Sequence, residues 1–178
     1  MSPQKLINYL LTIVVITSIV VTVNSDLQQK LKQTKPFSST EEAVYLRMQI
    51  ASEEMRAGFN ELFKSSELTL AQYNVLRILR GAGSEGLSCR EISERMINRD
   101  SDITRMLDRL EARGLITRER QTDDRRVVLA YISKAGFGLL SDLDRPVADL
   151  HKRQLKPLSK KELESLGALL KKVTAAAR

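Results

Sequence analysis

The sequence predicts a mainly α-helical fold with one small β-hairpin. Aromatic residues make up only 4% of the 178 residues, whereas leucine, arginine and glutamate are abundant. Apolar side chains recur at three- and four-residue spacing along most of the chain, which is the period of an amphipathic helix. Residues 115–132 depart from this pattern, with two short β-rich runs around a polar turn. The chain is long enough to bury one full hydrophobic core.

The first 25 residues form an apolar N-terminal segment whose nature the sequence leaves open. Residues 6–23 contain no charged side chain and would span about 27 Å as a helix, just short of a bilayer core. A cleaved signal peptide, a membrane anchor and a translation start assigned too far upstream all fit this pattern. The lysines that follow, Lys30, Lys32 and Lys35, would keep the rest of an anchored chain in the cytoplasm.

A polar linker and a long helix are predicted next. Residues 26–38 are polar and include Pro36. At residues 39–66, Ser39 and Glu42 have the spacing of a capping box, which would start a helix there. The apolar stripe of this helix comprises Val44, Met48, Ala51, Met55, Phe59, Leu62 and Phe63.

Three shorter helices follow. Capping boxes start the first two of them, namely Thr69 with Gln72 and Ser88 with Glu91. The first should end in the glycine-rich residues 81–86. The third should run over residues 101–113 and end at Gly114, which has the left-handed position that glycine favours after a helix.

The remaining elements are a hairpin and two helices. Strands are expected at residues 115–120 and 126–132, where β-branched residues flank a polar turn. Helices are expected at residues 133–155, with Pro146 as a kink, and at residues 159–176. No internal repeat accompanies them, so these elements belong to one architecture.

Two short helices, a three-turn helix and a hairpin, in this order, are typical of a winged helix-turn-helix. The third helix of such a domain enters the major groove of DNA, and the hairpin tip reaches the narrow minor groove. The net charge is +7, and all ten basic residues within residues 87–133 are arginines, which suit phosphate and guanine. DNA contacts are therefore expected from Ser101, Asp102, Thr104, Arg105 and Arg109 of the helix and from Arg125 and Arg126 of the hairpin. A winged-helix module that binds only proteins remains the alternative.

Residues 69–136 resemble the core of the multiple-antibiotic-resistance regulators, the MarR family. The resemblance rests on TRMLDRLEARGL at residues 104–115, followed by DRR at residues 124–126. It implies a homodimeric transcriptional regulator, usually a repressor, that binds a pseudo-palindromic operator in double-stranded DNA. It also implies a small-molecule effector, which the sequence does not identify.

Carried over by position, the resemblance divides the chain and extends the set of DNA-contacting residues. Residues 39–66 and 137–176 become dimerisation helices around a winged helix-turn-helix domain at residues 67–136. In the hairpin, Arg126 goes to DNA and Asp124 orients it. The remaining expected contacts are Ser88 and Arg90.

No enzymatic, cofactor or metal site is expected. One cysteine and one histidine exclude a disulfide framework and a Cys/His zinc site. The glycines of residues 81–86 match G-x-G-x-x-G, but the residues before them have helical rather than strand spacing. We expect Cys89 to be a half-buried residue rather than a redox switch, and His151 to have a packing role.

A DNA-binding role favours a cytoplasmic protein. We therefore interpret residues 1–23 as an extension caused by a start codon placed too far upstream. The alternative is a membrane-tethered signalling regulator, in which residues 6–23 anchor the chain in the inner membrane and the DNA-binding domain stays in the cytoplasm.

Overall fold

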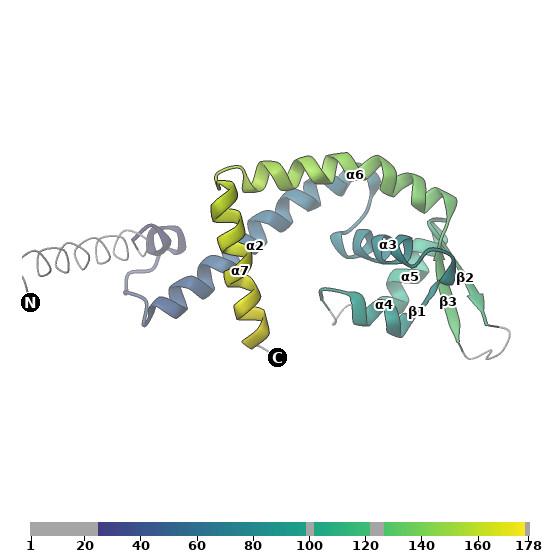
Figure 1. The fold of residues 1–178 in the computed structure, drawn as a ribbon, viewed down its shortest axis with the longest axis horizontal. Coiled ribbons are helices and arrows are strands. Elements are labelled where there is room, and N and C mark those ends of the chain that lie inside the picture. Colours follow the sequence, from purple (N-terminus) through teal and green to yellow (C-terminus); the bar gives the residue numbers. More distant parts are fainter. Residues whose placement is uncertain (1–24, 99–101, 122–126, 177–178) are drawn as a thin grey trace, which may run out of the picture. The chain divides into compact units, whose positions relative to one another are not determined.

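Helix α2, Thr40–Phe63, is the longest element among the described residues of the computed structural model. The structure describes residues 25–98, 102–121 and 127–176. The chain divides into two compact units, Met1–Glu54 and Met55–Arg178, so that α2 contributes to both. Figure 1 follows the chain through its elements. The predicted apolar segment at residues 6–23 lies outside the described residues, and among the helices that are described none has the length and apolar composition to cross a membrane.

In the first unit the described residues 25–31 are helical, where the sequence predicted a polar linker. Two ion pairs join this helix to α2. The guanidinium of Arg47 lies 2.5 Å from the carboxylate of Asp26, and Lys30 pairs with Glu54. The sequence did not reveal this helix because its residues are mostly polar and carry no apolar stripe.

The start of α2 differs in one detail from the predicted capping box. The Ser39 hydroxyl accepts a hydrogen bond from the backbone N–H of Glu42 at 3.1 Å, as expected. The Glu42 carboxylate, however, accepts from the hydroxyl and the backbone N–H of Ser38, both at 2.6 Å. The reciprocal bond therefore falls one residue earlier, and the bonds from Ser38 hold the pKa of Glu42 below its usual value.

The second unit contains the predicted succession of helices around a small sheet. Its helical elements are η1 (Lys64–Ser66), α3 (Leu70–Ala82), η2 (Gly83–Glu85), α4 (Cys89–Arg95), α5 (Ile103–Ala112), α6 (Lys134–Leu155) and α7 (Lys160–Ala176). The capping boxes that start α3 and α4 are both confirmed. Residues 81–86 form the last turn of α3 and the η2 turn, so no strand precedes the glycine-rich segment.

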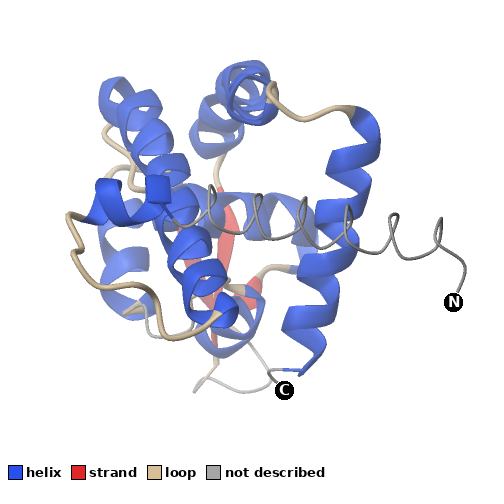
Figure 2. Ribbon diagram, turned by 90° about the vertical axis from the view of Figure 1, so that its left-hand side faces the viewer, coloured by secondary structure: helices blue, strands red, loops and turns tan. Residues whose placement is uncertain are grey.

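Three short antiparallel strands form the sheet, which Figure 2 shows in red between the helices. Strand β1 is Leu87–Ser88, β2 is Ile116–Arg120 and β3 is Val128–Ile132, in the order β1-β3-β2. The predicted hairpin is β2 with β3, and their pairing runs from Ile116 opposite Ile132 to Arg120 opposite Val128. The sequence did not reveal β1, because a two-residue strand has no periodicity and Ser88 also caps α4.

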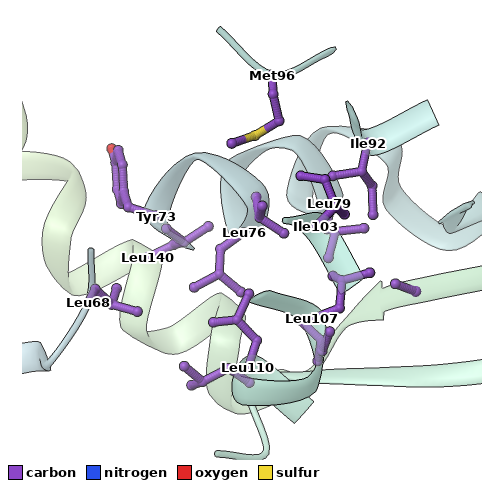
Figure 3. Close-up of a cluster of buried hydrophobic side chains, with 14 of the residues drawn as sticks. Leu68, Tyr73, Leu76, Leu79, Ile92, Met96, Ile103, Leu107, Leu110 and Leu140 are labelled. Atoms are coloured by element: carbon purple, nitrogen blue, oxygen red, sulfur yellow. The ribbon is translucent and has the colours of Figure 1, made fainter. Parts of the chain in front are cut away.

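One cluster of buried apolar side chains joins α3, α5 and α6 (Figure 3). Leu76 and Leu79 come from α3, Leu107 and Leu110 from α5, and Leu140 from α6, and each is at most 1% exposed. Burying a leucine side chain contributes roughly 1.5–3 kcal/mol, so this cluster firmly holds one face of α5.

The last two helices differ in burial. Helix α6 continues through Pro146 as a single helix and buries one side against the core. Helix α7 buries no side chain and exposes an apolar set. The members of this set, between 36% and 58% exposed, are Leu163, Leu166, Leu169, Leu170 and Val173.

Candidate nucleic-acid interface

Helix α5 turns a polar face outward because its opposite face is part of the core. The buried residues are Ile103, Leu107 and Leu110. Thr104 and Arg105 in the first turn and Arg109 one turn later are all exposed. Residues four positions apart lie on one side of a helix, so Arg105 and Arg109 form a single basic face.

Asp102 is the N-cap of α5. One of its carboxylate oxygens accepts a hydrogen bond from the backbone N–H of Arg105 at 3.1 Å, and the other lies 3.2 Å from Arg105 Nε. This geometry favours a role for Asp102 in holding Arg105 rather than in reading a base directly. The Arg105 side chain is still 80% exposed, so a partner can approach its guanidinium.

Helix α4 carries an exposed arginine, Arg90, and its N-cap residue Ser88 is already hydrogen-bonded. The Ser88 hydroxyl donates to the Glu91 carboxylate at 2.7 Å and accepts from the backbone N–H of Glu91 at 3.3 Å. The bond from the Ser88 hydroxyl, together with a bond from the Ser88 backbone N–H at 2.8 Å, holds the pKa of the Glu91 carboxyl below its usual value. Arg90 pairs with Glu94 at 2.9 Å but is 88% exposed. Ser88 therefore has a capping role in this structure, whereas Arg90 is accessible.

The predicted contact residues of the hairpin fall, in the sequence, between strands β2 and β3. Gln121 donates its backbone N–H to the carbonyl of Val127 at 3.0 Å, just beyond the paired strands. Residues 122–126 between them lie outside the described residues, and so does Ser101 at the start of the third helix. The predicted contacts that fall outside in this way are Ser101, Asp124, Arg125 and Arg126.

Comparison with known proteins identifies the family. The sequence pattern of the MarR family matches residues 68–128. The HTH-type transcriptional regulator MhqR of Bacillus subtilis is 31% identical over 106 residues, which are 60% of this chain and 72% of that protein. The chain belongs to the MarR family. This confirms the resemblance inferred from residues 104–115.

Two solved MarR structures share the fold of this chain. A MarR transcription factor from Planctomyces limnophilus is 41% identical with a TM-score of 0.60, over 77% of this chain and 98% of that one. A MarR variant from E. coli, in complex with operator DNA, is 29% identical with a TM-score of 0.65, over 71% of this chain and 89% of that one. The chain is thus a winged-helix transcriptional regulator of the MarR family.

Arg113 of this MarR-family chain has partners that the sequence did not reveal. Its guanidinium donates to the carbonyl of Glu67 at 2.7 Å and to the carbonyl of Ser66 at 2.8 Å. These bonds tie the end of α5 to the loop that follows α2, across more than forty residues of sequence.

Arg118 in β2 was also absent from the predicted set. Its guanidinium lies 2.5 Å from Glu111 and 2.7 Å from Asp108, two acids on the outward side of α5. The bond to Glu111, followed by the one to Asp108, raises the pKa of Arg118 above its usual value. The two-residue period of a strand could have indicated that Arg118 faces α5, because it places Arg118 on the same side of β2 as the buried Ile116.

One cavity lies beside α3 and α5, and another lies beside α2 and α3. The first, of about 310 Å³, is lined by Thr69, Gln72, Asp102, Arg105, Met106 and Arg109. The second, of about 300 Å³, is lined by Arg56, Asn60, Thr69, Leu70, Ala71, Asn74, Met96, Ile97 and Asn98. Over the described part of the chain, no group of three or more His, Cys, Asp or Glu side chains is arranged to hold a metal ion.

The single cysteine and the single histidine have ordinary surroundings. Cys89 is half-buried in the first turn of α4 and packs against the core cluster. The ring of His151 on α6 meets Phe59 of α2 edge-on, with 5.3 Å between centroids. Both positions agree with the packing roles expected from the sequence.

Proposed function

We propose that the chain is a homodimeric, sequence-specific regulator that represses transcription by binding a pseudo-palindromic operator in double-stranded DNA. The observation that carries this proposal is the outward face of α5. Thr104, Arg105 and Arg109 are exposed there, while the core holds the opposite face of the same helix. An exposed helix with arginines in its first two turns fits the width of the major groove.

The hairpin also supports binding to double-stranded DNA. Strands β2 and β3 end at a connection that carries Asp124, Arg125 and Arg126 in its sequence. Arginines at such a tip suit a narrow minor groove, which has an enhanced negative potential. In this proposal Arg105 and Arg109 act in the major groove, and Arg126 acts beside it with Asp124 as its orienting partner.

The apolar side chains left uncovered in a single chain support a homodimer. The exposed set on α7 consists of five large apolar residues, and Val44 and Met48 of α2 are 50% and 38% exposed. Contiguous apolar patches of this kind mark association surfaces in soluble proteins. We assign both patches to contact with a second copy, which would present two α5 helices to the two operator half-sites.

An effector would act through a cavity next to these helices. The space of about 300 Å³ between the end of α2, α3 and the turn after α4 has the size of a small ligand site. Its lining combines apolar side chains with amides and one arginine. Filling it would shift elements that support α5, and thereby release the operator.

The test is a selection of genomic fragments by the purified protein, followed by titrations of the selected duplex at several salt concentrations. We expect the logarithm of the affinity to fall steeply and linearly with the logarithm of the salt concentration. Arg105→Ala should relax base preference at one position, whereas Arg126→Ala should weaken binding to all sequences and reduce the salt slope by about one. If no fragment is retained, the rival protein-interaction module is favoured.

A further inference from the structure

A partly buried arginine joins the hairpin to the outward side of α5. In β2, Arg118 Nε and Nη2 lie 2.8 and 2.5 Å from the same oxygen of Glu111, and Nη2 is 2.7 Å from Asp108. The Arg118 side chain is only 25% exposed, in contrast to 80% for Arg105. We call Arg118, Asp108 and Glu111 the Arg118 cluster.

The backbone joins α5 to the near end of β2, while β3 is held on its other side by pairing with β1, Leu87 opposite Ala130 and Ser88 opposite Leu129. After α5 the chain reverses at Gly114, where φ is +67°, and the N–H of Leu115 bonds the carbonyl of Leu110 at 3.0 Å. Beyond the buried Ile116, the side chains of Thr117, Glu119 and Arg120 are exposed. Within β2, Arg118 is therefore the side chain past Ile116 that packs back on α5. It supplies a second attachment between β2 and α5, in addition to the pairing of β3 with β1.

The cluster also balances charge on a DNA-facing helix. Asp108 and Glu111 share α5 with the exposed Arg105 and Arg109. Uncompensated carboxylates there would repel phosphates, and Arg118 offsets them in a bonded geometry. A guanidinium can bridge two acids through its planar set of donors, whereas a lysine ammonium is a point charge at the end of a flexible stem.

We propose that Arg118 is a positioning residue for DNA recognition, which sets the angle between the β2–β3 hairpin and α5 so that both engage one duplex. This inference rests on the proposed function for its DNA readout. Arg118 itself contacts no base or phosphate. Its contribution is that the hairpin arginines reach the duplex only while the Arg118 cluster is intact.

A double-mutant cycle with Arg126→Ala tests the proposal on the selected duplex. In the wild-type background we expect Arg126→Ala to weaken binding by about tenfold. Arg118→Met keeps an apolar stem but no guanidinium. In this background Arg126→Ala should weaken binding to the duplex by less than twofold. Arg120→Met, on the same strand but exposed, is the matched control and should leave the tenfold effect intact. Equal costs of Arg126→Ala in all three backgrounds would overturn the proposal.

Arg118→Lys separates geometry from charge. It keeps the positive charge, so a merely electrostatic role predicts wild-type behaviour in the cycle, and that result would also overturn the proposal. A positioning role predicts that Arg118→Lys behaves like Arg118→Met. If Arg118→Met does not fold, the pair Asp108→Ala with Glu111→Ala removes the acceptors of the same bonds from the α5 side and takes its place.

A measurement without DNA distinguishes failure of this inference from failure of the proposed function. Spin labels at Glu119, beyond Arg118 on the hairpin, and at Ala112, in a Cys89→Ser background diluted with unlabelled protein, report the distance between hairpin and helix within one chain. The distance distribution should broaden in Arg118→Met and stay narrow in Arg120→Met. Unchanged distributions would refute the positioning role, even if the wild-type protein binds DNA. Broadening in a protein that binds no duplex would support the positioning role and refute the proposed function.

Discussion

Arg113 stabilises the fold through backbone carbonyls rather than through a charged partner. Its two bonds reach Ser66 and Glu67, at the end of η1, where carbonyls lack helical partners. Hydrogen bonds that involve a charged group contribute about 1.5–3 kcal/mol, and the exposure of this site places Arg113→Ala near the lower end of that range. Urea unfolding should show this loss, while Arg109→Ala on the same helix should stay within about 0.5 kcal/mol of the wild type. Equal effects of the two substitutions would contradict the role of these bonds.

Asp144 and Arg80 form the ion pair that links α6 to α3. The two terminal nitrogens of the Arg80 guanidinium, Nη1 and Nη2, donate to the Asp144 carboxylate at 2.9 and 2.8 Å. These bonds hold the pKa of Asp144 below its usual value. The unfolded chain therefore binds the proton first, so this stabilisation is present at neutral pH and is lost as the pH falls below about 4. Since the pair is exposed, Asp144→Asn should lower the free energy of unfolding by less than about 1 kcal/mol at pH 7.

The check for Asp144 is a pair of denaturant titrations, at pH 7 and near pH 2. The difference between Asp144→Asn and wild type should shrink toward zero in acid, because the wild-type carboxyl is then protonated as well. Asp142→Asn, on the same helix, controls for general charge effects. A difference that is as large in acid as at pH 7 would show that the Arg80 pair is not its source.

Two glycines at the start of α6 predict opposite effects of the same substitution. A Cβ on Gly136 would come within 3 Å of the backbone carbonyl of Leu115, which cannot move without disturbing the start of β2. Gly136→Ala should therefore cost about 1–3 kcal/mol. A Cβ on Gly138 meets nothing within 4 Å, so Gly138→Ala should stabilise the helix by up to about 1 kcal/mol. Thermal unfolding that shifts in the same direction for both would contradict the crowding at Gly136.

At the scale of elements, local signals were predictable and distant contacts were not. The capping boxes at Thr69 and Ser88 depend on residues three positions apart, so the sequence alone identifies them. The partners of Arg113 lie 46 and 47 residues away, and no spacing rule reaches them. Strand β1 and the helix at residues 25–31 were missed for a related reason, because neither carries enough apolar periodicity to be detected.

At the scale of the whole molecule, the exposed apolar residues of α7 predict that association and DNA binding are coupled. Leu166 is 39% exposed in the single chain, and Leu163 and Leu170 lie beside it on the same side of the helix. If a second copy covers this side, Leu166→Glu would bury an uncompensated carboxylate in the interface. Sedimentation should then show monomers at concentrations at which the wild type is a dimer.

The monomer would also lose most of its DNA affinity. One chain contacts one half-site, whereas a preformed dimer gains the second half-site as an intramolecular event. Titrations of the selected duplex should therefore show weaker binding for Leu166→Glu. Ala168→Glu, which adds the same charge at another exposed position of α7, should keep both the dimer and the affinity. A monomeric Leu166→Glu that binds as tightly as the wild type would instead mean that each α5 acts alone, and that the apolar side of α7 serves another partner.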